Sequence, residues 1–198
     1  LMDRYSTRGQ VEFVLRSRGR TLESVERAHE SHVAALARVR AGIPDGWASA
    51  DVERDSLSRF LFAPEDVIVV VGPDGLVANV AKYVDTQVVV GINSVPESQA
   101  GVLVRCAPEE GICALRRLDE GADLRVDHLT MVQASVDDSR SLRALNEVFI
   151  GHPSHQSARY ELRAGSVVER QSSSGLVVST GTGATGWGAS LKRGRHMG

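Results

Sequence analysis

The sequence predicts an α/β plus β fold, in which an N-terminal α/β domain is followed by a C-terminal β-rich domain. The first observation is a pair of continuous apolar segments, residues 66–71 and 87–92, which flank a helix-compatible stretch. A strand, a helix and a strand within ~30 residues form a βαβ unit, which implies a parallel, Rossmann-like sheet. The second observation is a series of short strand-like segments beyond Leu124, separated by Gly, Ser, Asp or Pro, which is typical of antiparallel sheets.

Length and composition restrict the class of protein. The 198 residues are 42% hydrophobic, which is enough for a buried core, and the formal net charge is -2 with a pI of about 6.3. A nucleic-acid binder would normally carry a basic stripe, so we expect no nucleic-acid partner. No apolar run approaches the ~20 residues that span a bilayer, and the first residues lack a secretory-signal layout. We therefore expect a cytoplasmic protein without a membrane partner.

The first predicted helix covers residues 21–40, where apolar side chains recur every three or four positions. Thr21 is a suitable N-cap, and Gly42 followed by Pro44 predicts the end of the helix. His29 and His32 fall close to one face of this helix. A metal pair and a structural pair are both compatible with that spacing, but no third ligand follows it, so we favour a structural pair and predict no metal site.

The two cysteines, Cys106 and Cys113, are seven residues apart, a spacing that fits no structural zinc pattern and no disulfide framework. We therefore expect both of them to be buried thiols. A further short helix is predicted over residues 108–120.

The strand over residues 66–71 is followed by the turn Gly72-Pro73-Asp74-Gly75 and a helix predicted over residues 75–84. Ligands of parallel sheets bind beyond the carboxyl ends of the strands, where this turn lies. Glycines let backbone amides approach phosphate oxygens closely, and a carboxylate can orient and deprotonate an acceptor hydroxyl. Pro-Asp-Gly is also an ordinary β-turn sequence, but its place between a buried strand and a helix favours a phosphate site.

Beyond the helix over residues 108–120, the predicted strands are residues 124–136, 142–150, 158–163, 166–170 and 176–179. We place the domains at residues 1–110 and 111–198, and we expect the second domain to be sandwich-like, with the ligand cleft between the two.

Two polar motifs in the second domain are suited to a dinucleotide. Asn146 and Glu147 offer an amide and a carboxylate that could hold a ribose diol or a carboxamide. On a regular strand these neighbours would face opposite sides, so joint action requires a twist or a bulge. A loop of hydroxyls and glycines, STGTGATGW over residues 179–187, follows the last strand. A simple Gly/Thr turn is the alternative interpretation, and Trp187 could stack on an adenine or cover the core.

In this order, the motifs resemble the NAD kinase family, with its Gly-Gly-Asp-Gly loop, Asn-Glu pair and Thr-Gly-x-Thr loop. The resemblance covers residues 69–190 and is greatest to the mitochondrial-type NAD kinases, through the segments GINSVPESQAGVL, ALNEVFIG and SSGL. It implies a fold shared with diacylglycerol kinases, a homodimer or tetramer, and phosphorylation of the adenosine ribose 2′-hydroxyl of NAD to give NADP. It also implies ATP with Mg²⁺ or another divalent cation as donor, with polyphosphate as an alternative donor.

The resemblance also implies roles for individual residues. Asp74 matches the catalytic aspartate, and Gly72 and Gly75 match glycines that contact the phosphates of the donor. Asn146 and Glu147 match the pair that holds the dinucleotide. Further NAD-binding positions implied by the family pattern are Thr182, Gly183, Thr185, Gly186, Trp187 and Ser190.

Two positions depart from the family pattern, because Pro73 replaces the second glycine and Leu76 replaces a threonine. Proline removes an amide donor, and leucine removes a hydroxyl. The alternative function is therefore a catalytically degenerate NAD(H)-binding sensor on the same fold. A lipid kinase would share the Gly-Asp-Gly loop but would have no use for the other two motifs. Family members continue beyond residue 198, so we expect the second domain to be incomplete at its C-terminus.

Overall fold

The structure, a computed structural model, describes residues 7–95, 101–137, 139–154, 156–185, 187, 188 and 190. The chain divides into two compact units. The first contains residues 1–77 and 85–126, and the second contains residues 78–84 and 127–198. The division after Val126 lies C-terminal to the boundary that we predicted between residues 110 and 111. Among the described residues, no helix is long and apolar enough to span a membrane.

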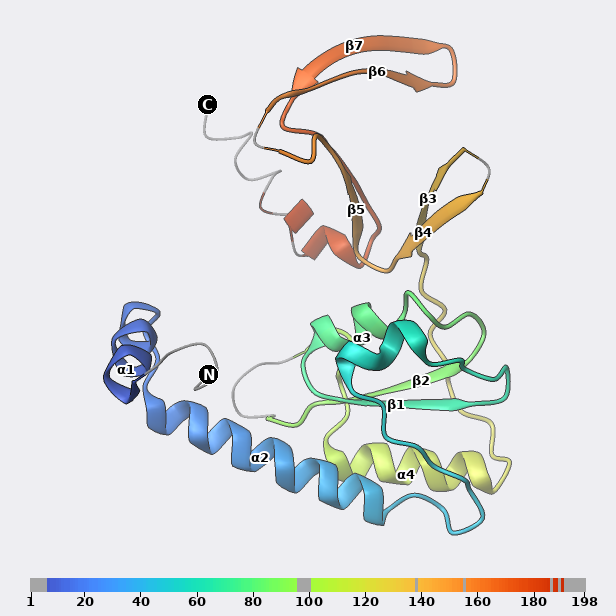
Figure 1. Ribbon diagram of the computed structural model, residues 1–198. Coiled ribbons are helices and arrows are strands. Elements are labelled where there is room, and N and C mark those ends of the chain that lie inside the picture. Colours follow the sequence, from blue (N-terminus) through green and yellow to red (C-terminus); the bar gives the residue numbers. More distant parts are fainter. Residues whose placement is uncertain are drawn as a thin grey trace. The chain divides into compact units, whose positions relative to one another are not determined.

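The first unit is built around a parallel strand pair (Figure 1). Its elements are α1 (Arg8–Ser17), α2 (Leu22–Ala41), the 3₁₀ helix η2 (Arg54–Arg59), β1 (Val67–Val71), α3 (Asp74–Val80, whose residues from Ala78 on belong to the second unit), β2 (Val88–Ile92) and α4 (Pro108–Asp119). β1 and β2 pair in parallel from Val67 with Val88 to Val71 with Ile92, which confirms the predicted βαβ unit. In Figure 1, α2 and α4 cover one face of the pair and α3 lies on the other. α3 ends at Val80, earlier than predicted, and α1 was not predicted.

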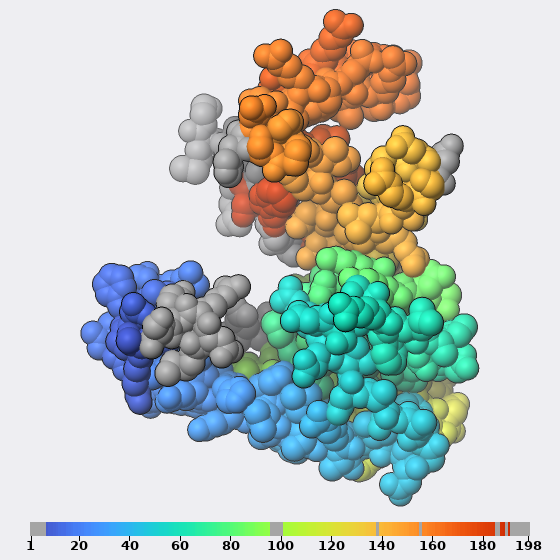
Figure 2. All heavy atoms as spheres, viewed as in Figure 1, coloured from blue at the N-terminus to red at the C-terminus, as the bar shows by residue number. Residues whose placement is uncertain are grey.

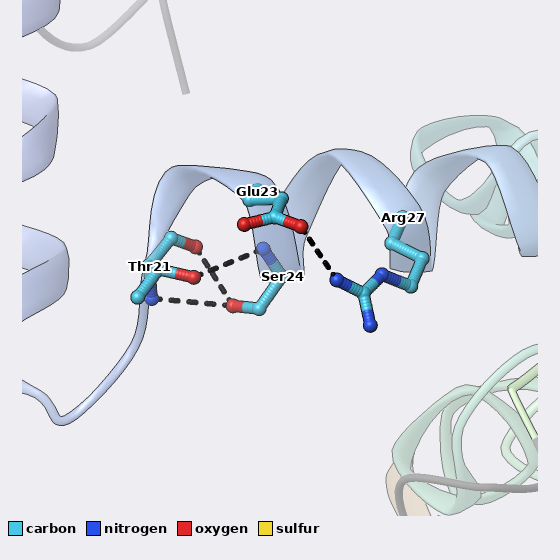
Figure 3. Close-up of polar contacts among 4 residues, drawn as sticks. All are labelled: Thr21, Glu23, Ser24 and Arg27. Atoms are coloured by element: carbon cyan, nitrogen blue, oxygen red, sulfur yellow. Dashed lines mark hydrogen bonds and ion pairs between the residues drawn. The ribbon is translucent and has the colours of Figure 1, made fainter.

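The start of α2 is fixed by a reciprocal cap, shown in Figure 3. The Ser24 N–H donates to Thr21 Oγ1 at 3.1 Å, and the Thr21 N–H donates to Ser24 Oγ at 3.2 Å. The predicted N-cap is thus confirmed, and two of the amides that a helix start leaves without partners are satisfied. Glu23 and Arg27 add an exposed ion pair at 2.8 Å, a contact of about 0.3–0.5 kcal/mol.

The core of the first unit lies between the strand pair and helices α2 and α4. Its buried members are Ala35, Val39, Val71, Val90, Ile92 and Leu115. Gly111 allows α4 to lie directly on β2, because a Cβ atom at this position would overlap the side chain of Ile92. Apolar burial, at about 25 cal/mol per Å², therefore holds the sheet against the two helices.

The two cysteines differ in their surroundings. Cys106 is half-buried, and its burial raises the pKa of its thiol, with the Glu110 carboxylate raising it further. Cys113 is exposed, so the prediction of two buried thiols is wrong for this residue. Cys113 lies on α4 next to Ile112, which is only half-buried, and the amphipathic helix turns the cysteine towards solvent.

The second unit consists of short antiparallel strand pairs. Its elements are β3 (Val132–Val136), β4 (Arg140–Ala144), β5 (Glu147–Ile150), β6 (Ala158–Ala164), β7 (Val167–Ser173), β8 (Leu176–Ser179) and the 3₁₀ helix η3 (Gly183–Thr185). β3 pairs with β4, β5 with β8, and β6 with β7, all antiparallel as predicted. The hairpin of β6 and β7 forms a continuous arm (orange in Figures 1 and 2). The described strands form separate pairs, and the sandwich-like arrangement stays a prediction.

Two strand predictions in this unit are wrong. The strand predicted over residues 124–136 begins only at Val132. The strand predicted over residues 142–150 is two strands, β4 and β5, separated by a bend at Leu145 and Asn146. Ala144 and Leu145 are both buried, at 8% and 4% exposure. Successive side chains of a regular strand face opposite sides, so the bend is what allows both neighbours to be buried.

We predict that His32 makes stability fall at low pH. Burial lowers the pKa of His32 below its usual 6.5, and His29 lowers it further. The unfolded chain therefore binds more protons than the folded chain as the pH falls through about 6.5, and the free energy of unfolding decreases there. Denaturant titrations at about pH 7.5 and pH 5.5 should show a smaller decrease in His32→Gln than in the unaltered protein. The control is His128→Gln, at an exposed histidine. An equal decrease in the free energy of unfolding in all three proteins would contradict the prediction.

Candidate functional site

The predicted site residues fall in both compact units. Asp74 and its glycines belong to the first unit, whereas the Asn-Glu pair and the Gly/Thr loop belong to the second.

The glycine turn directly follows β1 and is hydrogen-bonded to the last residue of β2. The Gly72 N–H donates to the Ile92 carbonyl at 2.9 Å, and Gly72 has a φ of +154° that favours glycine. Pro73 is exposed and has no N–H to offer. Leu76 lies over Gly72, since a Cβ atom there would be 3.2 Å from its Cδ2. Gly75 is exposed, with open space where a side chain would be.

Asp74, the first residue of α3, holds a segment that follows 28 residues later in the chain. Its Oδ2 accepts the Val102 N–H at 2.8 Å, and its Oδ1 accepts the N–H groups of Leu103 at 3.0 Å and Val104 at 2.9 Å. Gly101 is close as well, because a Cβ atom there would be 2.6 Å from Oδ1. A carboxylate has about four acceptor positions, so Oδ2 keeps one for a further donor.

The segment held by Asp74 extends the parallel sheet. The Asn93 N–H donates to the Cys106 carbonyl at 2.8 Å, and Ile92 forms a parallel bridge with Cys106. Gly91 allows the close approach, since a Cβ atom there would overlap the Leu103 carbonyl. The sequence analysis did not foresee this anchoring role, because nothing in the local sequence around Asp74 indicates the distant amides.

In the second unit, the Asn-Glu pair lies where the chain bends. Asn146 is in the bend itself, not on a strand as predicted, and Glu147 begins β5 opposite Ser179 of β8. The Thr180 N–H donates to the Asn146 carbonyl at 2.9 Å. The structure thus brings together two motifs that are more than thirty positions apart in the chain.

Two oxygen atoms of the Asn-Glu pair are without hydrogen-bond partners. Asn146 Oδ1 and Glu147 Oε2 are buried and accept no hydrogen bond in the described structure. Buried acceptors are almost always paired, and an unpaired one costs about 1–3 kcal/mol. These two atoms therefore mark a place where donors from outside the chain would be stabilising.

The Gly/Thr loop is wound tightly around Thr180. The Gly183 N–H donates to Thr180 Oγ1 at 3.1 Å, and the Ala184 N–H donates to the Thr180 carbonyl at 3.0 Å. A Cβ atom at Gly183 would fall on the Asn146 carbonyl, so only glycine permits this packing. The sequence analysis named Gly183 as a binding position and included Thr180 in the loop, but it assigned Thr180 no role of its own.

The remaining predicted residues lie in or beyond this loop. Thr182 is half-buried, Ser190 is exposed, and Thr185 ends η3. Gly186 lies outside the described residues. Trp187 is 45% exposed, and its ring centroid is 5.6 Å from that of Phe149 in a tilted arrangement. Phe149, which the sequence analysis also missed, shares a strand face with Glu147 because the two are separated by one residue.

Among the residues that the structure describes, no three His, Cys, Asp or Glu side chains gather as a metal site would require. Asp74 is largely occupied by backbone amides. A protein-built Mg²⁺ cage therefore does not fit these residues. Mg²⁺ is commonly held by substrate phosphates and waters with only one or two carboxylates, so it would have to arrive with ATP.

No family model matches the chain, and no curated protein or solved structure matches it either. A proposal for the function therefore rests on the motifs of this chain and on their local geometry. This geometry offers a carboxylate anchored at the end of a parallel sheet in one unit, and two unpaired acceptors beside a Gly/Thr loop in the other.

Gly183→Ala should loosen the contact between the Gly/Thr loop and the Asn146 bend. The added methyl group would overlap a backbone carbonyl, and overpacking of this kind costs about 1–3 kcal/mol. Gly181→Ala is the matched control, since nothing lies within 4 Å of a Cβ atom there. In Gly183→Ala alone, denaturant titration should show a lower free energy of unfolding, and the amide hydrogen of Thr180 should exchange faster. Equal behaviour of the two variants would argue against the packing described.

Asp74→Asn should release the segment that Asp74 holds. The asparagine oxygen can still accept the N–H groups on one side, but its NH₂ group would face the N–H that the other carboxylate oxygen now accepts. The hydrogen bonds to a charged group, about 1.5–3 kcal/mol each, are also lost. Amide hydrogens of Val102, Leu103 and Val104 should exchange roughly tenfold faster or more. The exposed Asp45→Asn is the control. Unchanged exchange at all three amides would rule out the anchoring role.

Proposed function

We propose that this protein is an NAD kinase, which transfers a phosphoryl group from ATP or polyphosphate to the adenosine ribose 2′-hydroxyl of NAD and so forms NADP. The observation that supports this most is the packing of Asn146 and Glu147 against the Gly/Thr loop, with one unpaired acceptor oxygen on each side chain. The motif resemblance to NAD kinases supplies the choice of ligand.

The unpaired oxygens suit a ligand that carries hydroxyl or amino donors, as ribose and adenine do. Both atoms are turned away from solvent in this structure. Neither makes a hydrogen bond with the chain, so a side-chain rotation that presents it to a ligand breaks no existing bond. A bound nucleoside would therefore gain two hydrogen bonds without displacing any in the protein.

Asp74 is the proposed group that orients the acceptor hydroxyl and accepts its proton. Its Oδ2 carries one backbone hydrogen bond and retains an acceptor position for the hydroxyl. The three amide contacts hold the carboxylate in a single orientation, which favours catalysis by positioning. Proton transfer to a positioned base contributes about 10²–10⁴ in rate.

A second candidate, the catalytically degenerate NAD(H)-binding sensor, is favoured by the state of the glycine turn. The Gly72 N–H is already bonded to the Ile92 carbonyl, Pro73 has no N–H, and Leu76 has no hydroxyl. This turn therefore offers few donors to a phosphate, whereas the Asn-Glu pair and the Gly/Thr loop of the second unit lie in contact through Thr180 and Asn146. The two candidates differ only in whether phosphoryl transfer follows binding.

NADP formation from NAD, Mg²⁺ and either ATP or polyphosphate tests the proposal. We expect turnover by the unaltered protein and a loss of about 10²-fold or more in Asp74→Asn. Because Asp74→Asn also releases the 101–104 segment, NAD binding should be measured by calorimetry in the same samples. Retained binding with lost turnover would assign the loss to the phosphoryl-transfer step. No NADP from either donor would contradict the kinase.

The double variant Pro73→Gly, Leu76→Thr separates the two candidates. If the protein is a degenerate kinase that still binds NAD, restoring the amide and the hydroxyl should create measurable turnover. An active kinase should instead show turnover before the change. Binding of NAD without turnover in both proteins would leave the sensor as the function.

A further inference from the structure

The hydroxyl of Thr180 joins both polar motifs of the second unit. Its Oγ1 lies 2.6 Å from the Leu145 carbonyl and 3.1 Å from the Asn146 carbonyl, and it accepts the Gly183 N–H at 3.1 Å. A hydroxyl donates one proton and accepts through two lone pairs. The shorter distance makes Leu145 its main acceptor, while Gly183 supplies the donor on the other side.

These bonds fall where the strand breaks. Leu145 and Asn146 form the bend between β4 and β5, so the regular strand pattern that satisfies backbone carbonyls is interrupted there. Buried carbonyl groups need partners, and Thr180 provides them for two successive residues through its hydroxyl and its N–H. One residue of the loop that follows β8 thus holds the bend, through its side-chain hydroxyl and its backbone N–H.

The direction of the Asn146 and Glu147 side chains depends on this bend. On an unbroken strand the two would face opposite sides, and only one could reach a shared ligand. Changing the backbone at Leu145 and Asn146 changes where both side chains point.

We propose that Thr180 is a positioning residue, whose hydroxyl fixes the Leu145–Asn146 bend against the Gly183 turn and so orients Asn146 and Glu147 for the dinucleotide. This inference rests on the proposed NAD-binding function. Thr180 acts through those two side chains, and nothing in its role requires contact with the ligand.

Thr180→Val and Thr180→Ser separate the hydroxyl from the rest of the residue. Valine keeps the shape and the backbone N–H that donates to Asn146, but it removes the bonds to Leu145 and Gly183. Serine keeps the hydroxyl. Ser135→Ala is the control, because it removes an exposed hydroxyl of the same unit that accepts the Gln133 side-chain amide at 3.4 Å and lies outside both polar motifs.

Calorimetry with NAD should show a dissociation constant raised about tenfold or more in Thr180→Val. The dissociation constants of Thr180→Ser and Ser135→Ala should stay within about twofold of that of the unaltered protein. The side-chain amide signals of Asn146 in NMR spectra should shift in Thr180→Val only. These signals report the orientation of Asn146 without any ligand.

The outcomes distinguish this inference from the proposed function. If the unaltered protein does not bind NAD, the proposed function fails, and unchanged Asn146 amide signals in Thr180→Val would then overturn the positioning role as well. If NAD binds equally to the unaltered protein and Thr180→Val, or if serine fails to rescue binding, the positioning role is overturned while NAD binding stands. Thr180→Ala is the second variant, and unfolding of both Val and Ala variants would assign Thr180 a purely structural role and overturn the inference.

Discussion

The parallel pairing of β1 with β2 is the contact on which the first unit depends. It sets the carboxyl ends of both strands at the same edge of the sheet, so that the turn after β1 bonds to Ile92 at the end of β2. The same pairing gives α2 and α4 an apolar face to cover. Without it, neither Asp74 nor the segment around Cys106 would have a fixed place.

In both units, one residue forms the hydrogen bonds that backbone groups lack where regular strand pairing ends. In the first, the Asp74 carboxylate accepts three successive backbone N–H groups. In the second, the Thr180 hydroxyl and N–H serve two successive carbonyls. Buried backbone groups must find partners wherever regular pairing ends, and polar side chains are the nearest source. Asp74 is thus both an anchor for the backbone and the proposed base, and Thr180 is adjacent in the structure to the proposed NAD-binding residue Asn146.

Local patterns in the sequence were sufficient for elements whose causes are local. Thr21 was recognised as a cap because its partner is three residues away, and β8 was predicted with the bounds that the structure shows. The sequence analysis noted that joint action of Asn146 and Glu147 requires a twist or a bulge, but it still predicted one strand over residues 142–150. The local sequence gives no sign of a break that depends on the distant Thr180. The anchoring role of Asp74 was not predicted either, because the N–H groups that donate to its carboxylate come from a distant part of the chain.

The approach of Gly183 to the Asn146 carbonyl has a consequence for how this chain can vary. The two motifs share one backbone contact, so a change in either is tolerated only when the other adjusts. We therefore expect substitutions in the two motifs to depend strongly on one another, despite the separation of the motifs in the gene. A chimaera that exchanges the Gly/Thr loop with that of another protein would need to carry the Leu145–Asn146 bend with it.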